Sequence, residues 1–194
     1  MAMNLIVGQS GGPTAVINSS LAGVYETAKN LGVNKVYGML YGIEGLLQEK
    51  MVDLDDMLGD IMSIELLKRT PSSYLGSCRC KLPTPEQDES VYDTLFRLFD
   101  KYEIGALLYI GGNDSMDTIA KLSAYGARIR SKVRFIGVPK TIDNDLMLTD
   151  HTPGYGSAAK YIATILKEVI ADASVYDIRS VTVAEIMGRH AGWL

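Results

Sequence analysis

The chain is poor in the residues that mark several classes of protein. It has only two cysteines among 194 residues, Cys78 and Cys80, and they flank a single arginine. A disulfide between them would be strained, because only one residue separates them. A zinc site would need further ligands, and the two histidines, His151 and His190, lie far away in the sequence. We therefore expect two small thiols, buried or partly exposed, in a reducing cytoplasm.

Long hydrophobic runs and an excess of charge are also missing. No apolar stretch approaches the ~20 residues of a membrane-spanning helix, so no membrane partner is expected. Residues 1–4 contain no basic segment of the kind that opens a signal peptide. The net charge is −4 and the charged residues are spread along the chain, which argues against a nucleic-acid-binding surface. With 47% hydrophobic residues, the chain can build one sizeable core.

Strand-like apolar runs alternate with segments of helical periodicity. The expected strands are residues 4–8, 35–40, 106–110, 133–138 and 181–186. The expected helices are a segment after Pro13 and residues 85–102, 115–125 and 157–172. Their apolar faces carry Ile17, Leu21, Val24, Tyr25 and Ala28 in the first helix, Val91, Leu95, Leu98 and Phe99 in the second, and Ala158, Ile162, Ile165, Leu166 and Val169 in the last. This alternation predicts a Rossmann-like α/β fold, a three-layer, mostly parallel sheet with helices on both faces.

In such sheets, ligands bind beyond the carboxyl ends of the strands. Four groups of glycine and polar residues follow expected strands in this chain. They are residues 10–12, 111–115, 140–145 and 187–189. One glycine pair could stand there by chance, but four converging loops are harder to dismiss. The sequence therefore predicts a binding site at this edge of the sheet.

The first of these loops contains Gly11 and Gly12, between a strand and a helix. Glycines let backbone N–H groups approach a phosphate, and the N-terminus of the following helix adds positive potential. The loop is neither a Walker A sequence nor the dinucleotide-binding fingerprint. The alternative is a tight turn in which glycine serves only the backbone geometry.

The second loop, residues 111–115, has the same placement. It can be a phosphate-cradling turn with Asp114 near a metal ion. Alternatively, Asn113, Asp114 or Ser115 is the N-cap of the next helix, and Asp117 assists in its first turn. The two interpretations are compatible with each other.

The third loop concentrates the most chemistry. Lys140 can neutralise phosphate charge, and Asp143 and Asp145, two positions apart, can accept a hydroxyl proton or help to hold a metal ion. Together with Thr141 they suggest phosphoryl transfer, in which catalysis is mostly positioning and charge stabilisation. The alternative is an aspartate-rich loop that satisfies its own backbone.

Two arginines and a histidine allow more than one interpretation. Arg79 can be a solvated loop residue, as most arginines are. Arg189, beside Gly188 and after an expected strand, can hold a phosphate with two hydrogen bonds, or it is a surface residue of a helix. His190 is better explained by packing or capping than by metal binding.

Residues 188–194 resemble the start of a further element without a stop signal, so we expect a fragment of a longer chain.

Taken together, the motifs resemble the N-terminal half of the phosphofructokinases, over about Asn4 to Leu194. The matching motifs are Gly11-Gly12, Leu75-Gly76-Ser77 with Arg79, Gly111 to Ser115, Pro139 to Asp145, and Met187-Gly188-Arg189. Members that use ATP usually carry glycine at the positions of Asp114 and Lys140, so the chain looks like the pyrophosphate-dependent branch. The residues support this, since a carboxylate at 114 would repel the α-phosphate of a nucleotide. A cation at 140 would stabilise the charge that moves between pyrophosphate and the sugar.

The resemblance also implies a role for each site residue. Asp143 would be the general base, Lys140 and Asp114 would select the donor and stabilise the transition state, and Arg79 would face the transferred phosphate. The turn residues Gly11, Gly12, Gly112 and Ser115 would bind the donor, with Gly12 using its backbone N–H. Thr141, Ile142 and Asp145, together with Met187, Gly188 and Arg189, would bind the sugar phosphate.

The chain departs from the family at three points. Asn113 stands where the family usually has a magnesium-binding carboxylate, so Mg²⁺ would rest on Asn113 and Asp114, with an uncharged ligand in the first position. Ser180 stands where an arginine usually reaches the sugar phosphate of a neighbouring subunit, and Arg179 is one position away. The second half of the family's chain, which supplies much of the fructose 6-phosphate pocket, is not in this sequence.

The leading hypothesis is therefore the N-terminal, catalytic half of a pyrophosphate-dependent 6-phosphofructokinase. It would transfer phosphate from Mg²⁺-pyrophosphate to the 1-hydroxyl of fructose 6-phosphate, and it would be a homo-oligomer in the full-length form. One alternative is an ATP-dependent member. The other is a non-catalytic, phosphate-binding regulatory subunit or fragment, for which Asn113 and the missing second half are the best support.

Overall fold

The computed structural model describes residues 3–188, 192 and 194. The chain forms two compact units, residues 1–140 and residues 141–194, which we treat separately. Among the described residues, unit 1 contains the sheet and six helices, and unit 2 contains one long helix and the segments that flank it.

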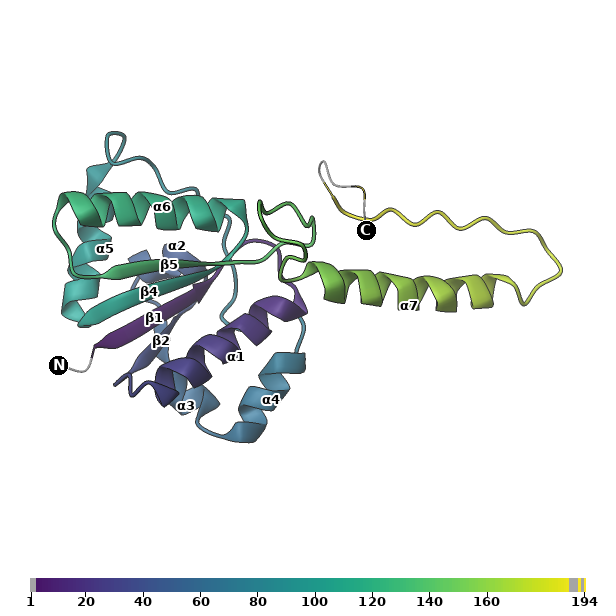
Figure 1. Cartoon of the computed structure of the whole chain (residues 1–194), viewed down its shortest axis with the longest axis horizontal. Helices are drawn as coiled ribbons and strands as arrows, with labels where there is room; N and C mark the ends of the chain where they lie inside the picture. The colour runs from purple at the N-terminus through teal and green to yellow at the C-terminus, as the bar shows by residue number, and fades with distance from the viewer. Residues whose placement is uncertain (1–2, 189–191, 193) are drawn as a thin grey trace. The chain divides into compact units, whose positions relative to one another are not determined.

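Unit 1 is built on a five-stranded sheet with β1 at its centre (Figure 1). The strands are β1 (Asn4–Gln9), β2 (Val36–Met39), β3 (Met51–Asp53), β4 (Ile104–Gly111) and β5 (Arg134–Pro139). Their order is β3-β2-β1-β4-β5, and all neighbours are parallel except β2 and β3. Four of the five predicted strands are confirmed, with ends shifted by a few residues. Strand β3 was not predicted, because three residues are too few to show a periodicity.

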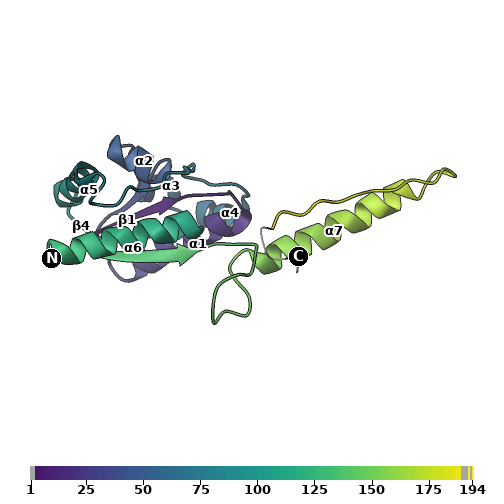
Figure 2. The same ribbon diagram turned by 90° about the horizontal axis from the view of Figure 1, so that it is seen from above.

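Helices cover both faces of the sheet (Figure 1 and Figure 2). One face carries α1 (Ala15–Asn30), α3 (Leu54–Leu58) and α4 (Ile61–Arg69). The other carries α2 (Gly42–Leu47), α5 (Glu89–Lys101) and α6 (Asn113–Arg128). The predicted three-layer α/β fold is thus confirmed, and among the helices the sequence analysis missed the short α2, α3 and α4.

Two hydrophobic cores lie on opposite sides of the sheet. Neighbouring residues of a strand point to opposite faces, so Ile6 and Tyr109 belong to one core while Val7 and Ile110 belong to the other. Strands buried on both faces appear in the sequence as continuous apolar runs, which is why β1 and β4 were predictable.

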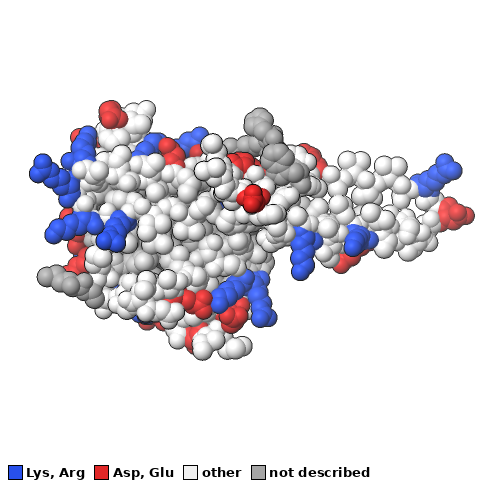
Figure 3. Space-filling model, viewed as in Figure 1, with Lys and Arg blue, Asp and Glu red and all other residues white. Residues whose placement is uncertain are grey.

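Figure 3 shows lysine and arginine side chains interspersed with aspartate and glutamate on the face that it displays.

Helix α5 begins four residues later than predicted. Pro85 was expected to open it, but the side chain of Asp88 accepts a hydrogen bond from the backbone N–H of Ser90 and caps the helix there. This N-cap satisfies a donor that the first helical turn leaves unpaired. The residues before Asp88 form a turn in which Gln87 N–H bonds to the carbonyl of Thr84.

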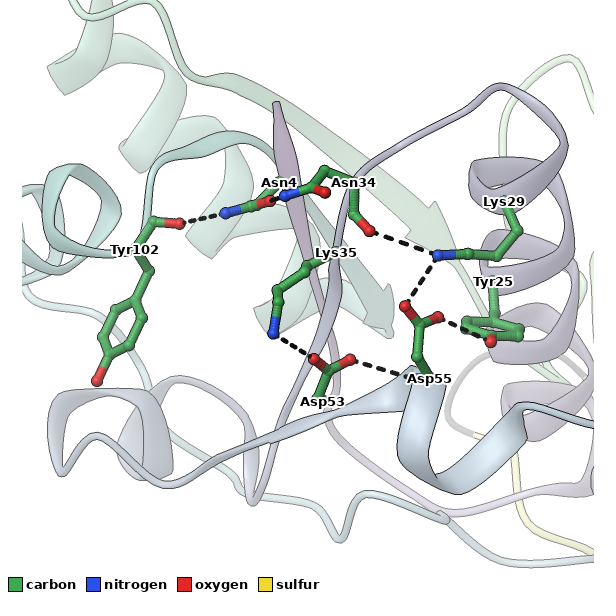
Figure 4. Close-up of polar contacts among 8 residues, drawn as sticks. All are labelled: Asn4, Tyr25, Lys29, Asn34, Lys35, Asp53, Asp55 and Tyr102. Carbon is green, nitrogen blue, oxygen red and sulfur yellow. Dashed lines mark hydrogen bonds and ion pairs between the residues drawn. The ribbon is translucent and has the colours of Figure 1, made fainter. Parts of the chain in front are cut away.

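A polar network fixes the amino-terminal end of β1 and the neighbouring end of α1 (Figure 4). Asn4 Nδ2 donates to the carbonyl of Tyr102 at 2.8 Å. Lys29 Nζ contacts Asp55 Oδ2 at 2.8 Å, and Tyr25 OH donates to Asp55 Oδ1 at 2.9 Å. Burial and the Asp55 carboxylate together raise the pKa of Tyr25 to about 12. Burial opposes the charge of Asp55, but the hydrogen bonds from Lys29 and Tyr25 outweigh it and lower the pKa of that carboxyl.

Unit 2 contains α7 (Tyr155–Ala173), which confirms the helix predicted for residues 157–172. Its predicted apolar stripe is only partly buried, and no residue of α7 is fully buried. The strand predicted for residues 181–186 is wrong: Val181 and Val183 are 91% and 87% exposed in a segment without regular structure. A strand needs a neighbour for its backbone hydrogen bonds, and in the described part of unit 2 the only isolated β-bridge joins Thr141 and Gly154.

Among the residues that the structure describes, no helix is both long and apolar enough to cross a membrane.

Candidate functional site

The turns after β1 and β4 meet at the carboxyl edge of the sheet. The chain leaves β1 toward β2 on one side and returns to β4 on the other, so this edge is the topological switch point where open α/β sheets bind ligands. Ser10 N–H donates to the carbonyl of Ile110 at 2.9 Å. A Cβ on Gly111 would lie only 2.7 Å from the carbonyl oxygen of Ser10, so only glycine allows the two backbones to approach this closely. Gly11 has a φ of +81°, which also favours glycine.

The end of β5 adds Lys140 to the same place. Its backbone N–H donates to the carbonyl of Gly111 at 2.9 Å, and its Nζ donates to the carbonyl of Gly12 at 2.7 Å. Only 9% of the residue is exposed. The structure therefore brings together three of the four predicted loops, at least through Gly11, Gly12, Gly112 and Lys140.

Helix α6 starts directly at the second glycine turn. The N-cap is Gly112, and no side chain caps the helix, so the prediction that Asn113, Asp114 or Ser115 is the N-cap is wrong. The extended backbone of Gly112 ends the turn one residue earlier, which puts all three inside the first helical turn. Asn113 and Asp114 are exposed there, whereas Ser115 is buried beside Gly111. Asp117 lies beyond the first turn, in which Asp114 is the acidic residue, and it forms an ion pair with Lys121 at 2.7 Å.

The segment that carries Arg79 is hydrogen-bonded to the first glycine turn. The carbonyl of Cys78 accepts from Gly11 N–H at 3.1 Å and from Ser10 Oγ at 3.2 Å. Ser77 Oγ donates to the carbonyl of Gly11 at 2.6 Å. Arg79 follows Cys78 directly and is exposed. Its cation therefore belongs to a segment that is bonded to the glycine turn, whereas its proposed contact with phosphate stays a prediction.

Lys81, which the sequence analysis did not single out, also belongs to this edge. Its Nζ lies 3.8 Å from Asp114 Oδ1, and both side chains are largely exposed. The signal for Lys81 in the sequence was a second cation two residues after Arg79.

The two predicted thiols are confirmed as free, with Cys78 buried and Cys80 partly exposed. Burial raises the pKa of the Cys80 thiol.

In unit 2, residues 141–145 form a loop held by its own hydrogen bonds. Thr141 Oγ1 accepts from the backbone N–H of Asp143 at 3.0 Å and lies 3.2 Å from Asp145 Oδ1. Asn144, at a φ of +51°, accepts from Thr152 N–H at 2.9 Å and donates to the carbonyl of Asp150. Side chains of the loop thus form hydrogen bonds with backbone groups of the same loop, as the alternative interpretation expected. The same bonds hold the segment that carries Asp143 and Asp145. Ile142 and Asp143 are partly buried in it.

The fourth predicted loop differs from the other three. The expected strand before it is absent, and Met187 is 79% exposed in unit 2, beside the exposed Gly188. Arg189 and His190 lie outside the described residues. Ser180 Oγ lies 3.3 Å from the carbonyl of Ala173, which keeps it next to the end of α7.

The described residues offer a divalent cation few ligands. They contain no cluster of three or more histidine, cysteine, aspartate or glutamate side chains that could hold a metal. Asn113 and Asp114 supply one amide oxygen and one carboxylate at the start of α6. This set fits Mg²⁺, which usually takes one or two protein oxygens and completes its shell with water and substrate phosphates.

Comparison with known proteins gives a consistent answer. Residues 4–194 match the family model described as "Phosphofructokinase". The chain is 44% identical to a pyrophosphate–fructose 6-phosphate 1-phosphotransferase of Xanthomonas campestris and 41% identical to one of Methylococcus capsulatus, over 98% and 100% of its length. In both cases the alignment covers 46% of the relative, so the chain spans about half the length of the curated proteins that it matches.

A solved structure agrees in fold as well as in sequence. It is the pyrophosphate-dependent phosphofructokinase of Nitrosospira multiformis, which is 40% identical and superposes with a TM-score of 0.80. The superposition covers 89% of this chain and 42% of that one. The family match extends over nearly the whole chain, and the glycine turns and Lys140 lie at the carboxyl edge of the sheet, where open α/β sheets usually bind ligands. The chain therefore belongs to the phosphofructokinase family.

Proposed function

We propose that the protein, in its full natural length, transfers phosphate from Mg²⁺-pyrophosphate to the 1-hydroxyl of fructose 6-phosphate. The products are fructose 1,6-bisphosphate and inorganic phosphate. The observation that carries this proposal is the pair of charges at the sheet edge, with Lys140 on the Gly12 turn and Asp114 in the first turn of α6. The names of the relatives at 41–44% identity support the same donor and acceptor.

The donor would bind against the two glycine turns and the N-terminus of α6. Backbone N–H groups of Gly12 and Gly112 and the positive end of the helix attract anionic oxygens. Thr14 contributes a further group, because its Oγ1 is buried and has no hydrogen-bond partner in the described part of the chain. The Lys140 ammonium and the Arg79 guanidinium would stabilise the charge that builds on the phosphoryl group in the transition state. Ser115, buried beside Gly111, would support the shape of the turn.

Asp143 would be the general base. It would accept the proton of the sugar 1-hydroxyl while the oxygen forms a bond to phosphorus and the bond to the leaving phosphate breaks. Asp143 is three residues from Lys140, so covalent geometry alone keeps their Cα atoms within about 11 Å. Thr141, whose hydroxyl contacts both Asp143 N–H and Asp145, would orient the carboxylate and the sugar.

The remaining roles complete the site. Asn113 and Asp114 would hold Mg²⁺, which supplies charge neutralisation on the phosphates when it is bound. Ile142, Met187, Gly188 and Arg189 would bind the sugar phosphate, and the full-length protein would act as a homo-oligomer in the reducing cytoplasm. Lys81, 3.8 Å from Asp114, would limit the repulsion between that carboxylate and pyrophosphate.

Phosphoryl transfer to fructose 6-phosphate with Mg²⁺ tests the donor directly. We expect the full natural chain to form fructose 1,6-bisphosphate with pyrophosphate and not with ATP at the same concentration. Turnover with ATP alone would identify an ATP-dependent member and overturn the roles given to Asp114 and Lys140. Inactivity with both donors would favour a non-catalytic phosphate-binding module, with Asn113 as the departure that explains it.

The variant Asp143→Asn tests the proposed base. It should lower kcat with pyrophosphate by about 10²- to 10⁴-fold, because the amide cannot accept the hydroxyl proton. The matched control is Asp150→Asn, an exposed carboxylate of the same region whose backbone carbonyl, not its side chain, bonds to Asn144. Unchanged kcat in Asp143→Asn would remove Asp143 from the mechanism.

A further inference from the structure

Gln9, the last residue of β1, forms a hydrogen-bonding centre that no phosphate role explains. The residue is fully buried, and its carboxamide makes four contacts. Its Nε2 donates to the carbonyl of Ile17 and to Asn18 Oδ1, both at 3.0 Å. Its Oε1 accepts from Leu75 N–H at 2.9 Å and lies 3.0 Å from Ser73 Oγ. Gln9 therefore joins the end of β1 to the start of α1 and to the segment that leads to Arg79.

Asn18 extends this network from α1. It is also fully buried, and its Oδ1 accepts from Tyr74 N–H at 2.8 Å in addition to Gln9. Its Nδ2 donates to the carbonyl of Thr70 at 2.8 Å. The two amides together thus bind the backbone at Thr70, Tyr74 and Leu75.

These bonds matter because residues 70–84 contain neither helix nor strand. The position of such a segment depends on hydrogen bonds to neighbouring residues, because it has no regular backbone hydrogen bonds of a helix or a sheet. The Gln9–Asn18 pair holds residues 70–75, and the glycine turn holds residues 77 and 78 through Ser77 Oγ and the carbonyl of Cys78. Arg79 comes directly after these two attachments.

We propose that Gln9 and Asn18 are positioning residues that hold Arg79 at the donor turn. They touch no reacting atom; they set the affinity and alignment of the phosphoryl donor through the backbone of residues 70–79. The kinetic part of this inference rests on the proposed function, whereas the structural part does not.

The experiment compares Gln9→Met with Asn4→Leu in the full natural chain. Asn4 is the matched control, because it is a buried amide at the opposite end of the same strand and bonds to Tyr102 and Asn34 instead (Figure 4). Both variants should lower the thermal midpoint. Only Gln9→Met should lower kcat/KM for pyrophosphate, by about 10- to 100-fold, as expected when a catalytic cation is displaced by about an ångström.

A double variant then decides whether Gln9 acts through Arg79. If it does, Gln9→Met combined with Arg79→Met should be within about twofold of Arg79→Met alone, because the group it positions is already gone. Fully additive losses in the double variant would overturn the proposal. A combination of Asn4→Leu with Arg79→Met should be additive.

Hydrogen–deuterium exchange gives a readout that does not depend on activity. Peptides covering residues 73–79 should exchange faster in Gln9→Met than in Asn4→Leu and the unsubstituted protein. Unchanged exchange there would overturn the proposal even if activity fell. If the unsubstituted protein used no donor, the proposed function would fail, and the exchange result would still decide whether Gln9 fixes the segment.

Discussion

At the scale of single residues, Lys140 combines a positive charge with burial at the carboxyl edge of the sheet. It is the one lysine or arginine among the buried residues that the structure describes, with 9% of its surface exposed, and its ammonium contacts the carbonyl of Gly12. Burying a cation is costly unless polar groups surround it. Under the proposed function, the phosphates of the donor add to the polar groups around this ammonium.

Replacing Lys140 by methionine should therefore affect the donor more than the fold. We expect kcat/KM for pyrophosphate to fall by about 10²- to 10³-fold, the usual cost of removing one group that stabilises charge in a transition state. Lys132→Met, which removes an exposed lysine just before β5, should leave it unchanged. Equal losses in the two variants would point to net charge rather than to the site.

At the scale of elements, the site depends on two glycine turns that touch. Gly111 ends β4 against the carbonyl of Ser10, which follows β1. Contacts of this kind transmit any added volume into the backbone, because protein interiors are close-packed. The spacing of β1 and β4 at this edge is therefore sensitive to a single methyl group.

The variant Gly111→Ala should lower the free energy of unfolding by about 1–3 kcal/mol, since its Cβ would stand 2.7 Å from a backbone oxygen that cannot rotate away. The control Gly23→Ala lies on the exposed side of α1 with nothing within 4 Å of the new Cβ. It should instead stabilise the protein by about 0.5–1 kcal/mol, because alanine favours the helix. Urea unfolding followed by circular dichroism measures both, and a neutral Gly111→Ala would contradict the close contact.

The opposite end of the sheet should show a pH dependence. The pKa of Tyr25 is raised to about 12, so its stabilising contribution is complete below pH 10 and is lost as the pH rises toward 12. The pKa of Asp55 is lowered, so its contribution is present at neutral pH and is lost in acid as the pH falls through that value.

Asp55→Asn removes the carboxylate that serves both Tyr25 and Lys29. At pH 7 it should cost about 0.5–1 kcal/mol of unfolding free energy, a discounted value because both members of the ion pair are about one-third exposed. Its stability should also fall less steeply between pH 10 and 12 than that of the unsubstituted chain. Parallel stability curves in urea titrations across this range would show that Asp55 does not act on Tyr25.

At the scale of the whole molecule, the two units differ in how much they bury. Unit 1 holds both hydrophobic cores, whereas α7 of unit 2 has no fully buried residue, and Val181, Val183 and Met187 are strongly exposed. Local opening costs least where few apolar contacts must be broken. Unit 2 should therefore open more readily than unit 1.

Limited proteolysis of the 194-residue chain tests this difference. We expect the first cuts between residues 141 and 188 and the accumulation of a resistant fragment close to residues 1–140. Mass spectrometry of the time course identifies the fragments. Early cuts within β4 or α6 would contradict the assignment of the cores to unit 1.

Much of the fold could be read from local patterns. The buried strands β1 and β4 are continuous apolar runs, and α1, α5 and α6 have apolar faces at helical spacing, because burial imposes these patterns on residues close in sequence. Helix α7 followed the same rule, although its stripe is only partly buried. The strand predicted for residues 181–186 failed because composition can favour an extended chain but cannot supply its hydrogen-bonding neighbour.

The sequence by itself therefore determined the alternation of strands and helices, the loops that carry glycine and charge, and the family resemblance. Tertiary structure alone decided the order of the strands and the network of Gln9 and Asn18. The physical reason is distance along the chain. Gln9 meets Ser73 across 64 residues, and Lys140 meets Gly12 across 128. Local periodicity carries no record of such pairs, because they form only when the strands assemble into one sheet.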